Sequence, residues 1–351
     1  MKKYQKFQST HKNISFLIDS YAFIKIILLL LIMGVIFIVS AGLGDMNIHP
    51  LHVLNVFFGG GTDLEKLVIL DFRLPRIIIS LLVGMALAVA GGILQGIIKN
   101  PLASPDIIGI TGGAGAAVVA FLALFSDKNH SLTVSIDWLP LAAFIGATII
   151  GFSVYLLAWR NGVAPFRLVL IGIGISALMQ GLTTFFMLVG PIYRASDANI
   201  WITGSVNGAS WEQISFLLPW TTVLLIIAFI SSRTINIQEL GQEIATGVGN
   251  RVEKSRFLLL LLSTSLVGGA VAFAGGIGFV GLMAPHIARR LVGSSYGMLL
   301  PTAACIGAIL VMVADLIGRT LFSPLEVPAG VFTAAIGAPY FIYLLFRANK
   351  R

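Results

Sequence analysis

The sequence has little charge. Asp, Glu, Lys and Arg together make up 11% of its 351 residues, against roughly 25% in an average soluble protein. Hydrophobic residues make up 57%, and the mean hydropathy is +0.95. This composition excludes both an ordinary water-soluble enzyme and a disordered chain. It predicts a protein that is surrounded mostly by lipid.

Cysteine is almost absent as well. The single cysteine, Cys305, lies in an apolar stretch, so the chain cannot form an internal disulfide or a cysteine-rich metal site. We interpret Cys305 as a small buried apolar residue. The sequence predicts no bound metal and no cofactor.

A nucleotide-binding loop is also missing. The phosphate-binding pattern is G-x-x-x-x-G-K-[ST], and the nearest string, from Gly249 to Ser255, lacks the glycine before Lys254. We therefore predict that the chain is not an enzyme. Any ATPase that drives it must be a separate polypeptide docked on its cytoplasmic face.

Ionisable residues are scarce inside the apolar stretches. Carriers coupled to protons or sodium usually keep such groups near the middle of the bilayer. Asp315 has Arg319 four residues later, a spacing that lets the two charges neutralise each other on one helix face. We interpret His286 as a helix-packing or hydrogen-bonding group. An ion-coupled secondary transporter and a passive channel stay open as alternative classes.

Long uncharged stretches are abundant, and they predict an all-α polytopic membrane protein. About 20 apolar residues span a bilayer. One stretch, Phe257–Ala288, holds 32 residues, about 48 Å of helix, and is too long for one ordinary crossing. Gly275-Gly276 within it favours a sharp turn, so we divide it and predict ten transmembrane helices. The other eight stretches are Ile26–Gly44, Ile77–Ile98, Ile107–Ser126, Trp138–Trp159, Leu168–Tyr193, Gln213–Ser232, Met298–Ala314 and Ala329–Phe346.

Positive charge predicts the orientation of these helices. With both termini cytoplasmic, 17 of the 23 Lys and Arg residues lie inside and 6 lie outside, as the positive-inside rule requires. The inner residues are Lys2, Lys3, Lys6, Lys12, Lys25, Lys99, Arg160, Arg167, Arg233, Arg251, Lys254, Arg256, Arg289, Arg290, Arg347, Lys350 and Arg351. The outer residues are Lys66, Arg73, Arg76, Lys128, Arg194 and Arg319.

These boundaries define one membrane domain at 24–347, with cytoplasmic tails at 1–23 and 348–351. The longest cytoplasmic loop, 233–256, mixes charged residues with glycines, which predicts short helices joined by turns. This loop is either a solvated surface or a coupling element that docks on a partner. The protein is predicted to lie in the cytoplasmic (plasma or inner) membrane.

Three arginines break the positive-inside trend. Arg73 and Arg76 lie just before the second span, and Arg319 lies at the outer end of the ninth. Arginine binds carboxylates bidentately, so these residues can receive the acidic side chains of an extracytoplasmic partner. Interfacial anchoring by snorkelling is the alternative.

Six motifs carry a resemblance to a known family. They are RLPR at 73–76, GMALAVAGGILQGIIKNPLASPDIIGITGGAG at 84–115, LGQEIATGVG at 240–249, GGIGFVGLMAPHIARRLVG at 275–293, ADLIGR at 314–319 and EVPAGVFTAAIGAP at 326–339. From about 70 to 347 the chain resembles the FecCD-type permease subunits of ABC importers for iron–siderophore complexes, haem and cobalamin. The resemblance implies a type II ABC importer permease with ten transmembrane helices and both termini cytoplasmic.

The resemblance also implies partners. A second permease chain, identical or a sister, would pair around a central path. Two ATP-binding subunits would bind on the cytoplasmic side, and a substrate-binding protein would dock outside. ATP hydrolysis on the separate subunits would drive transport, and no nucleic acid is involved. Ferric siderophore is the favoured substrate because siderophore systems are common in the family, while haem and cobalamin stay open.

Site residues follow from the matched motifs. The resemblance implies binding-protein docking for Arg73, Arg76 and Arg319, paired with glutamates on the partner. It implies ATPase coupling for Gly241, Glu243, Ala245 and Gly249. Helix-end geometry near the inner gate is expected for Gln95, Asn100, Pro101, Pro105, Gly275, Gly276, Pro285, His286 and Arg289.

Overall fold

The computed structural model describes residues 4–8, 15–126, 132–159, 165–191 and 195–348. Within them, one hairpin of β1 (Tyr4–Gln8) and β2 (Ser15–Asp19) precedes the helices, and all other named elements are helical. The predicted all-α class is therefore confirmed for the body of the chain, while the hairpin in the predicted tail was not foreseen. Outside the described residues lie parts of both predicted tails and the cations Lys2, Lys3, Lys12, Lys128, Arg160, Arg194, Lys350 and Arg351.

Ten helices correspond in order to the ten predicted spans. Among the described residues, seven helical segments are long and apolar enough to cross a membrane, whereas α6 and α15 are shorter apolar helices and α13 has 13 residues. The count of ten crossings and the orientation of the termini stay predictions. The ten are α1 (Ser20–Gly42), α4 (Leu74–Ile98), α6 (Ile110–Leu124), α7 (Leu139–Ala158), α8 (Pro165–Val189), α10 (Trp211–Glu239), α12 (Val252–Ala274), α13 (Val280–Val292), α14 (Tyr296–Thr320) and α15 (Ala329–Ala348).

Short helices join these long ones. Between α1 and α4, the chain forms two small helices and a π-helical turn. Two further short helices precede α6 and α10, a 3-10 turn precedes α7, and one short helix joins α10 to α12. The elements are α2 (Pro50–Phe57), α3 (Asp63–Lys66), η1 (Leu67–Arg73), α5 (Pro105–Ile108), η2 (Ile136–Trp138), α9 (Ala195–Thr203) and α11 (Gln242–Gly247).

The predicted break at Gly275-Gly276 is confirmed. Helix α12 ends at Ala274 and α13 begins at Val280. Gly275 has φ +65°, and a Cβ there would lie 2.0 Å from the carbonyl oxygen of Trp201. The turn therefore requires glycine both for its backbone conformation and for the close passage of the last turn of α9.

Helix α10 continues beyond its predicted end. It runs to Glu239, so the first part of the predicted loop 233–256 is helical. Ser232, Ile235 and Gln238 are buried at a helical spacing along this extension, which shows that packing against neighbouring helices prolongs α10. The rest of the predicted loop holds one short helix, α11, between two turns, and ends in the first turn of α12.

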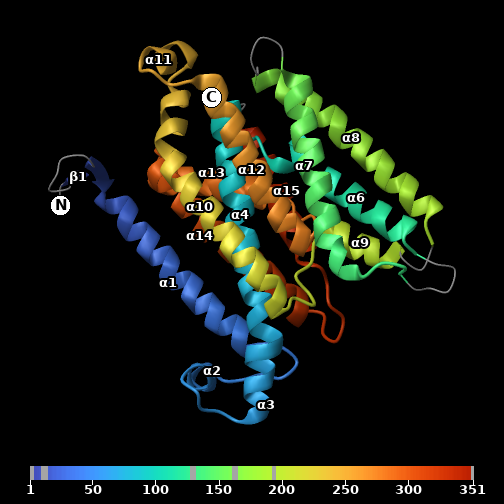
Figure 1. Ribbon diagram of the computed structural model, residues 1–351. Helices are drawn as coiled ribbons and strands as arrows, with labels where there is room; N and C mark the ends of the chain where they lie inside the picture. Colours follow the sequence, from blue (N-terminus) through green and yellow to red (C-terminus); the bar gives the residue numbers. More distant parts are fainter. Residues whose placement is uncertain (1–3, 9–14, 127–131, 160–164, 192–194, 349–351) are drawn as a thin grey trace.

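Helix α4 forms the centre of the bundle. It packs against α10, α12, α13 and α14, and most of its residues are buried. Helix α1 instead lies at the edge of the bundle, with many exposed apolar side chains, and it runs from the end that carries α11 to the end that carries α2 and α3 (Figure 1). A helix that is apolar on all sides and exposed along its length is suited to lipid contact.

Two glycines let α4 and α14 approach each other closely. A Cβ on Gly84 would lie 2.3 Å from the carbonyl oxygen of Gly307, and one on Gly307 would lie 2.2 Å from that of Gly84. Such contacts between small residues let helix backbones pack tightly in membranes.

Gly84→Ala should therefore lower the stability of the bundle by about 1–3 kcal/mol, because the added methyl group meets backbone that cannot move aside. Thermal unfolding of the purified protein in detergent measures the loss. Gly34→Ala on α1 is the matched control, since a Cβ at Gly34 has no neighbour within 4 Å. Equal unfolding temperatures for the two variants would contradict this packing.

Candidate functional site

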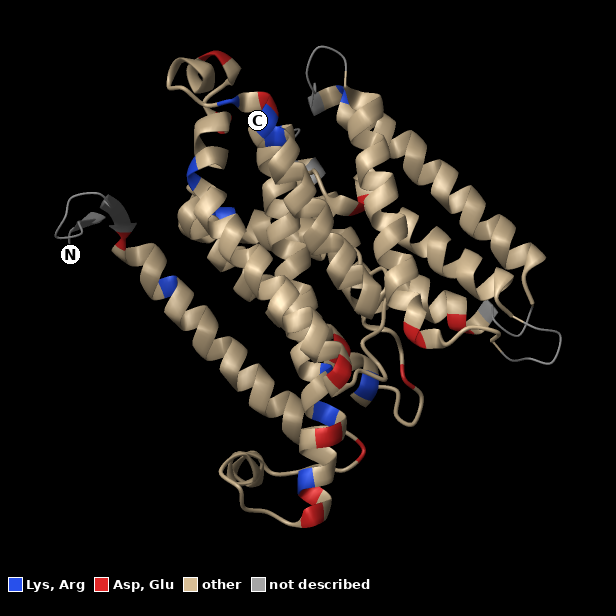
Figure 2. Cartoon of the chain, viewed as in Figure 1, with Lys and Arg blue, Asp and Glu red and all other residues tan. Residues whose placement is uncertain are grey.

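Charged residues gather at the two ends of the helical bundle and are sparse between them, as Figure 2 shows. At one end, two of the three predicted docking arginines, Arg76 and Arg319, contact two carboxylates. Arg76 Nε donates to Asp315 Oδ1 at 2.8 Å, and Arg76 Nη1 donates to both carboxylate oxygens of Glu326 at 3.0 Å. Asp315 Oδ2 also lies 3.6 Å from Arg319 Nε. The expected neighbour Arg319 is thus one of two arginines around Asp315, and Arg76 is the nearer.

Arg73 and Arg319 hold the end of α1. Arg73 Nη1 donates to the carbonyl oxygens of Ala41 and Gly42 at 2.8 and 3.0 Å. Arg319 donates to the carbonyl oxygens of Leu43 and Ser40. The last carbonyls of a helix lack intrahelical donors and carry partial negative charge, so two cations here stabilise the end of α1.

This capping limits what Arg73 and Arg319 can reach. Each is 8% exposed, while the side chain of Glu326 is 40% exposed. The cluster therefore presents Glu326 outward, while the side chain of Arg76 directly beneath it is 12% exposed. We name the outer cluster the group of Arg73, Arg76, Asp315, Arg319 and Glu326.

Sequence reasoning missed Glu326 and Asn207 as members of this region. Asn207 Oδ1 accepts a hydrogen bond from Arg76 Nη1 at 3.3 Å. Both residues lie in short segments that connect helices, and neither has a charged neighbour at helical spacing. The signal that was available for Glu326 was its place as the first residue of the EVPAG motif, just before α15.

At the opposite end, glycines bracket the short helix α11. Gly241 has φ +116° and Gly249 has φ +84°, values that favour glycine. Of the other predicted coupling residues, Ala245 is fully buried and Glu243 is exposed. The predicted coupling residues thus shape the turns and the helix, and Glu243 faces outward.

Exposed apolar side chains lie in α11 and on both sides of it. Ile244 in α11 is 54% exposed, while Leu240, at the end of α10, and Val248, directly after α11, are 63% and 64% exposed. We call these three residues the apolar stripe of α11. Sequence reasoning did not single out this stripe. An exposed apolar stripe beside charged residues is typical of a protein–protein contact.

A polar network connects the end of α10 to α13 and α14. Glu239 Oε1 lies 3.4 Å from Arg289 Nη1 and accepts from Tyr296 Oη at 3.2 Å, while Arg289 Nη2 donates to Tyr296 Oη at 3.0 Å. Asn236 Oδ1 accepts from the backbone N–H of Tyr296 at 2.9 Å. Arg289, predicted as inner-face charge, is therefore tied to the helix that leads into α11.

Several predicted gate residues meet where α4, α5 and α13 come together. Gln95 is buried and its Nε2 donates to the carbonyl oxygen of Leu282 on α13 at 3.3 Å. Pro105 begins α5, and a Cβ on Gly281 would lie 2.9 Å from its ring. Pro285 is buried inside α13.

Other predicted gate residues make separate contacts beside that junction. Asn100 Oδ1 accepts from the N–H of Leu102 at 2.9 Å and forms the turn that contains Pro101. His286 lies edge-on to the ring of Tyr340, with 5.9 Å between centroids. Among the described residues, neither ring nitrogen of His286 has a hydrogen-bond partner.

Asp106 is a second acidic residue that sequence reasoning missed. Its carboxylate accepts from Thr111 Oγ1 at 3.1 Å and from the backbone N–H of Phe279 at 3.4 Å. Phe279 precedes α13 and has φ +65°, which is uncommon for a bulky residue. Asp106 therefore connects α5 to the start of α13.

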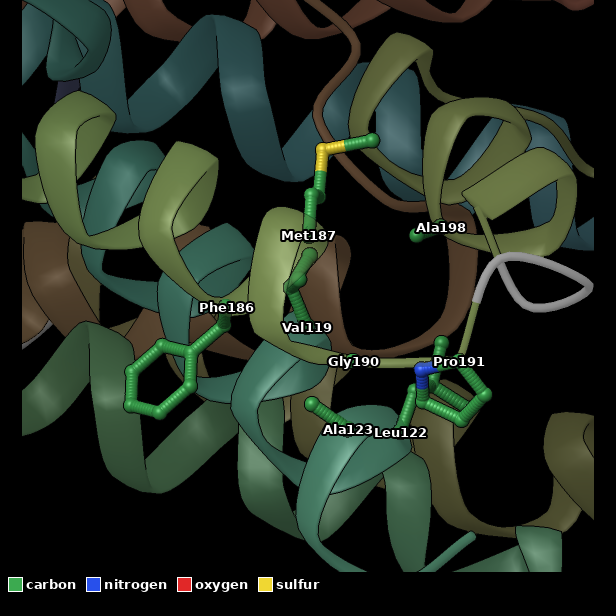
Figure 3. A pocket seen from close by; sticks show the side chains of 8 residues that line it. All are labelled: Val119, Leu122, Ala123, Phe186, Met187, Gly190, Pro191 and Ala198. Atoms are coloured by element: carbon green, nitrogen blue, oxygen red, sulfur yellow. The ribbon is translucent and has the colours of Figure 1, made fainter. Parts of the chain in front are cut away.

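A small pocket lies between α6, α8 and α9 (Figure 3). Its cavity measures about 10 Å³, which is room for about one water molecule. We interpret it as a packing gap. The residues that line it are Val119, Leu122, Ala123, Phe186, Met187, Gly190, Pro191 and Ala198.

The chain is thus a multi-helix membrane bundle with a polar cluster at one end and a short exposed helix at the other. The model of the FecCD transport family matches residues 29–347. The chain belongs to the FecCD transport family. This finding confirms the predicted resemblance.

Known proteins resemble the chain over nearly its whole length. It is 59% identical over 332 residues to "Probable siderophore transport system permease protein YfhA" of Bacillus subtilis (strain 168), covering 95% of this chain and 97% of that protein. It is 45% identical over 320 residues to "Iron(3+)-hydroxamate import system permease protein FhuG" of the same organism, covering 91% and 95%. A solved structure described as an inward-facing conformation of a metal-chelate type ABC transporter is 29% identical, with a TM-score of 0.81, covering 92% of this chain and 99% of that chain.

Proposed function

We propose that this protein is the membrane-spanning permease subunit of a binding-protein-dependent ABC importer for ferric siderophore complexes. The observation that carries the proposal is the pair of opposite ends: the exposed apolar stripe of α11 at one end and the outer cluster at the other. Family membership and the names of the two similar proteins support the substrate class. Haem and cobalamin are the alternative substrates.

In this proposal, α11 is the site at which a separate ATP-binding subunit docks. The stripe of Leu240, Ile244 and Val248 would enter an apolar groove on that subunit, a common way for amphipathic helices to bind. The network of Glu239, Arg289 and Tyr296 would then pass movement of α11 to α13 and α14. Two ATP-binding subunits and a second permease chain complete the transporter.

The proposed orientation puts α11 and both termini in the cytoplasm and the outer cluster outside. Lys25 Nζ donates to the carbonyl oxygen of Leu291, so the start of α1 and the end of α13 lie at the same end of the bundle. Ten crossings, an even number, would put both termini on the same side of the membrane. In this orientation, the membrane domain is residues 24–347, and the cytoplasmic tails are residues 1–23 and 348–351.

The docking proposal for the outer arginines assigns them different parts. Arg76 would contact a carboxylate of the binding protein directly, because it borders the exposed Glu326. Arg73 and Arg319 would position the end of α1 and add positive charge to the surface. The gate residues Gln95, Asn100, Pro101, Pro105, Gly275, Gly276, Pro285 and His286 would keep the helix ends in place during the switch between outward and inward access, and Arg289 would act in the coupling network.

Uptake of labelled iron tests the substrate proposal. Cells that lack this chain should lose uptake of one siderophore class among hydroxamate, catecholate and carboxylate siderophores, and the plasmid-borne chain should restore it. Labelled haem and cobalamin are tested separately. Unchanged siderophore uptake with loss of haem or cobalamin uptake would overturn the substrate, and uptake without any ATP-binding subunit would favour an ion-coupled secondary transporter.

The role of α11 is tested by a variant with Leu240, Ile244 and Val248 all replaced by serine. Capture of the ATP-binding subunit by the purified permease should fall at least about tenfold, because the lost apolar area corresponds to more than 1.4 kcal/mol. Phe58→Ser is the control, since Phe58 is an exposed apolar residue (89% exposed) between α2 and α3. Normal capture by the triple variant would argue against the proposed coupling site.

A further inference from the structure

The ion pair between Arg76 and Glu326 places an acidic side chain of this chain on the arginine that is proposed to dock a partner. We propose that Glu326 is an internal competitor: it occupies, on Arg76, the site that a carboxylate of an extracytoplasmic binding protein takes when that protein docks. The inference rests on the docking role proposed for Arg76. It adds a residue of this chain that tunes the affinity of docking.

Arg76 donates from its N–H groups to two carboxylates that differ in burial, Asp315 and Glu326. Its Nε donates to Asp315, whose side chain is 4% exposed and which also neutralises Arg319. Its Nη1 donates to both oxygens of Glu326, whose side chain is 40% exposed. The buried pair is costly to break, whereas exposed ion pairs contribute about 0–1 kcal/mol. Exchange therefore takes place at the Glu326 position.

Local attachments let Glu326 leave Arg76 without unfolding a helix. Glu326 lies in the connection between α14 and α15, two residues after the exposed Pro324. The adjacent Val327 is held by its own hydrogen bond, from its N–H to the carbonyl oxygen of Gly318 at 3.0 Å. Rotation of the Glu326 side chain therefore frees Arg76 while the backbone stays in place.

The charge of Glu326 opposes the approach of an acidic partner. The outer cluster holds three guanidinium groups and two carboxylates, and Asp45 adds a carboxylate whose charge acts on Arg73. When a carboxylate of the partner replaces Glu326, the guanidinium of Arg76 stays paired. Removing the charge of Glu326 makes this region one unit more positive and leaves the Nη1 group of Arg76 without its ionic partner, so an acidic partner should bind faster and more tightly.

The direct test measures binding of the purified siderophore-binding protein that supports uptake in the experiment above. The complete transporter, with its ATP-binding subunits, is held in lipid nanodiscs. Glu326→Gln should increase the affinity by about three- to fivefold at low salt, the equivalent of up to 1 kcal/mol. The gain should arise mainly in the association rate and shrink as salt is raised.

Two comparison variants make the result specific. Asp71→Asn removes the same charge from an exposed carboxylate two residues before Arg73, and it should change the affinity by less than about twofold. Glu326→Asp keeps the charge but shortens the side chain, so it should give a smaller increase than Glu326→Gln. Should Glu326→Gln fail to fold, Glu326→Asp carries the test by itself.

A double-mutant cycle locates the effect on Arg76. In the background of Arg76→Gln, the change Glu326→Gln should have no further effect on affinity. Unchanged or weaker binding by Glu326→Gln, while Arg76→Gln still weakens docking, would overturn the competitor role and leave the docking proposal intact. Binding that is insensitive to Arg76→Gln would overturn both.

Discussion

Replacing Asp315 by alanine should destabilise the folded protein by about 3–5 kcal/mol, the usual cost of removing one partner from a buried ion pair. The side chain of Asp315 is 4% exposed and lies between Arg76 and Arg319. Without it, Arg319 loses its only ion-pair partner among the described residues, and Arg76 loses the more buried of its two carboxylate partners. A lower unfolding temperature in detergent measures this loss.

Asp71→Ala is the matched control for Asp315→Ala. Asp71 is an exposed carboxylate at the same end of the bundle, and substitution of such a residue usually changes stability by less than about 0.5 kcal/mol. If both variants unfold at the same temperature, the structural role of Asp315 is wrong. Full stability combined with complete loss of uptake in the Asp315 variant would instead support an ion-coupled carrier.

Replacing Arg289 by alanine should uncouple ATP hydrolysis from transport. The substitution removes the contacts of Arg289 with Glu239 at the end of α10 and with Tyr296 at the start of α14. Coupling free energies between sites are typically about 1–3 kcal/mol, which corresponds to about 5- to 150-fold, so uptake per ATP hydrolysed should fall by at least about fivefold. Capture of the ATP-binding subunit should persist, because α11 itself is unchanged. Proteoliposomes that contain the complete transporter allow both quantities to be measured.

Arg290→Ala provides the control for charge at this position. Arg290 is the next residue on α13 and is exposed, so its removal should leave uptake per ATP close to that of the unchanged protein. Tyr296→Phe removes only the hydroxyl group that joins Arg289 and Glu239, and its effect should be intermediate. Equal coupling in the Arg289 and Arg290 variants would show that the network does not transmit movement.

The helical class and the order of the helices followed from the sequence because apolar length is a local property. The 32 residues of Phe257–Ala288 exceed one crossing, and the structure has two helices there, separated at Gly275-Gly276. The predicted positions of the helix ends were less accurate. Helix α10 extends to Glu239 because residues such as Ile235 are buried against other helices, which no local pattern of charge could indicate.

The sequence also identified the family, because its motifs are long and occur in a fixed order. It placed Arg73, Arg76 and Arg319 at one end of the predicted bundle, and the structure brings them together. What the sequence could not indicate was their partners. The i, i+4 spacing pointed to Arg319 as the partner of Asp315, yet Arg76, which is 239 residues away, is nearer.

By itself, then, the sequence determined a helical membrane protein of the FecCD family, with a break at Gly275-Gly276 and charged ends. Only the tertiary structure decided that Arg73 and Arg319 cap α1, that Glu326 pairs with Arg76 and that Tyr296 joins Glu239 to Arg289. The physical reason is that the length of an apolar stretch and the backbone freedom of glycine determine structure locally, within a few residues of the chain. The partner of a buried charge depends instead on which helix ends meet in space, and those ends are far apart in the sequence.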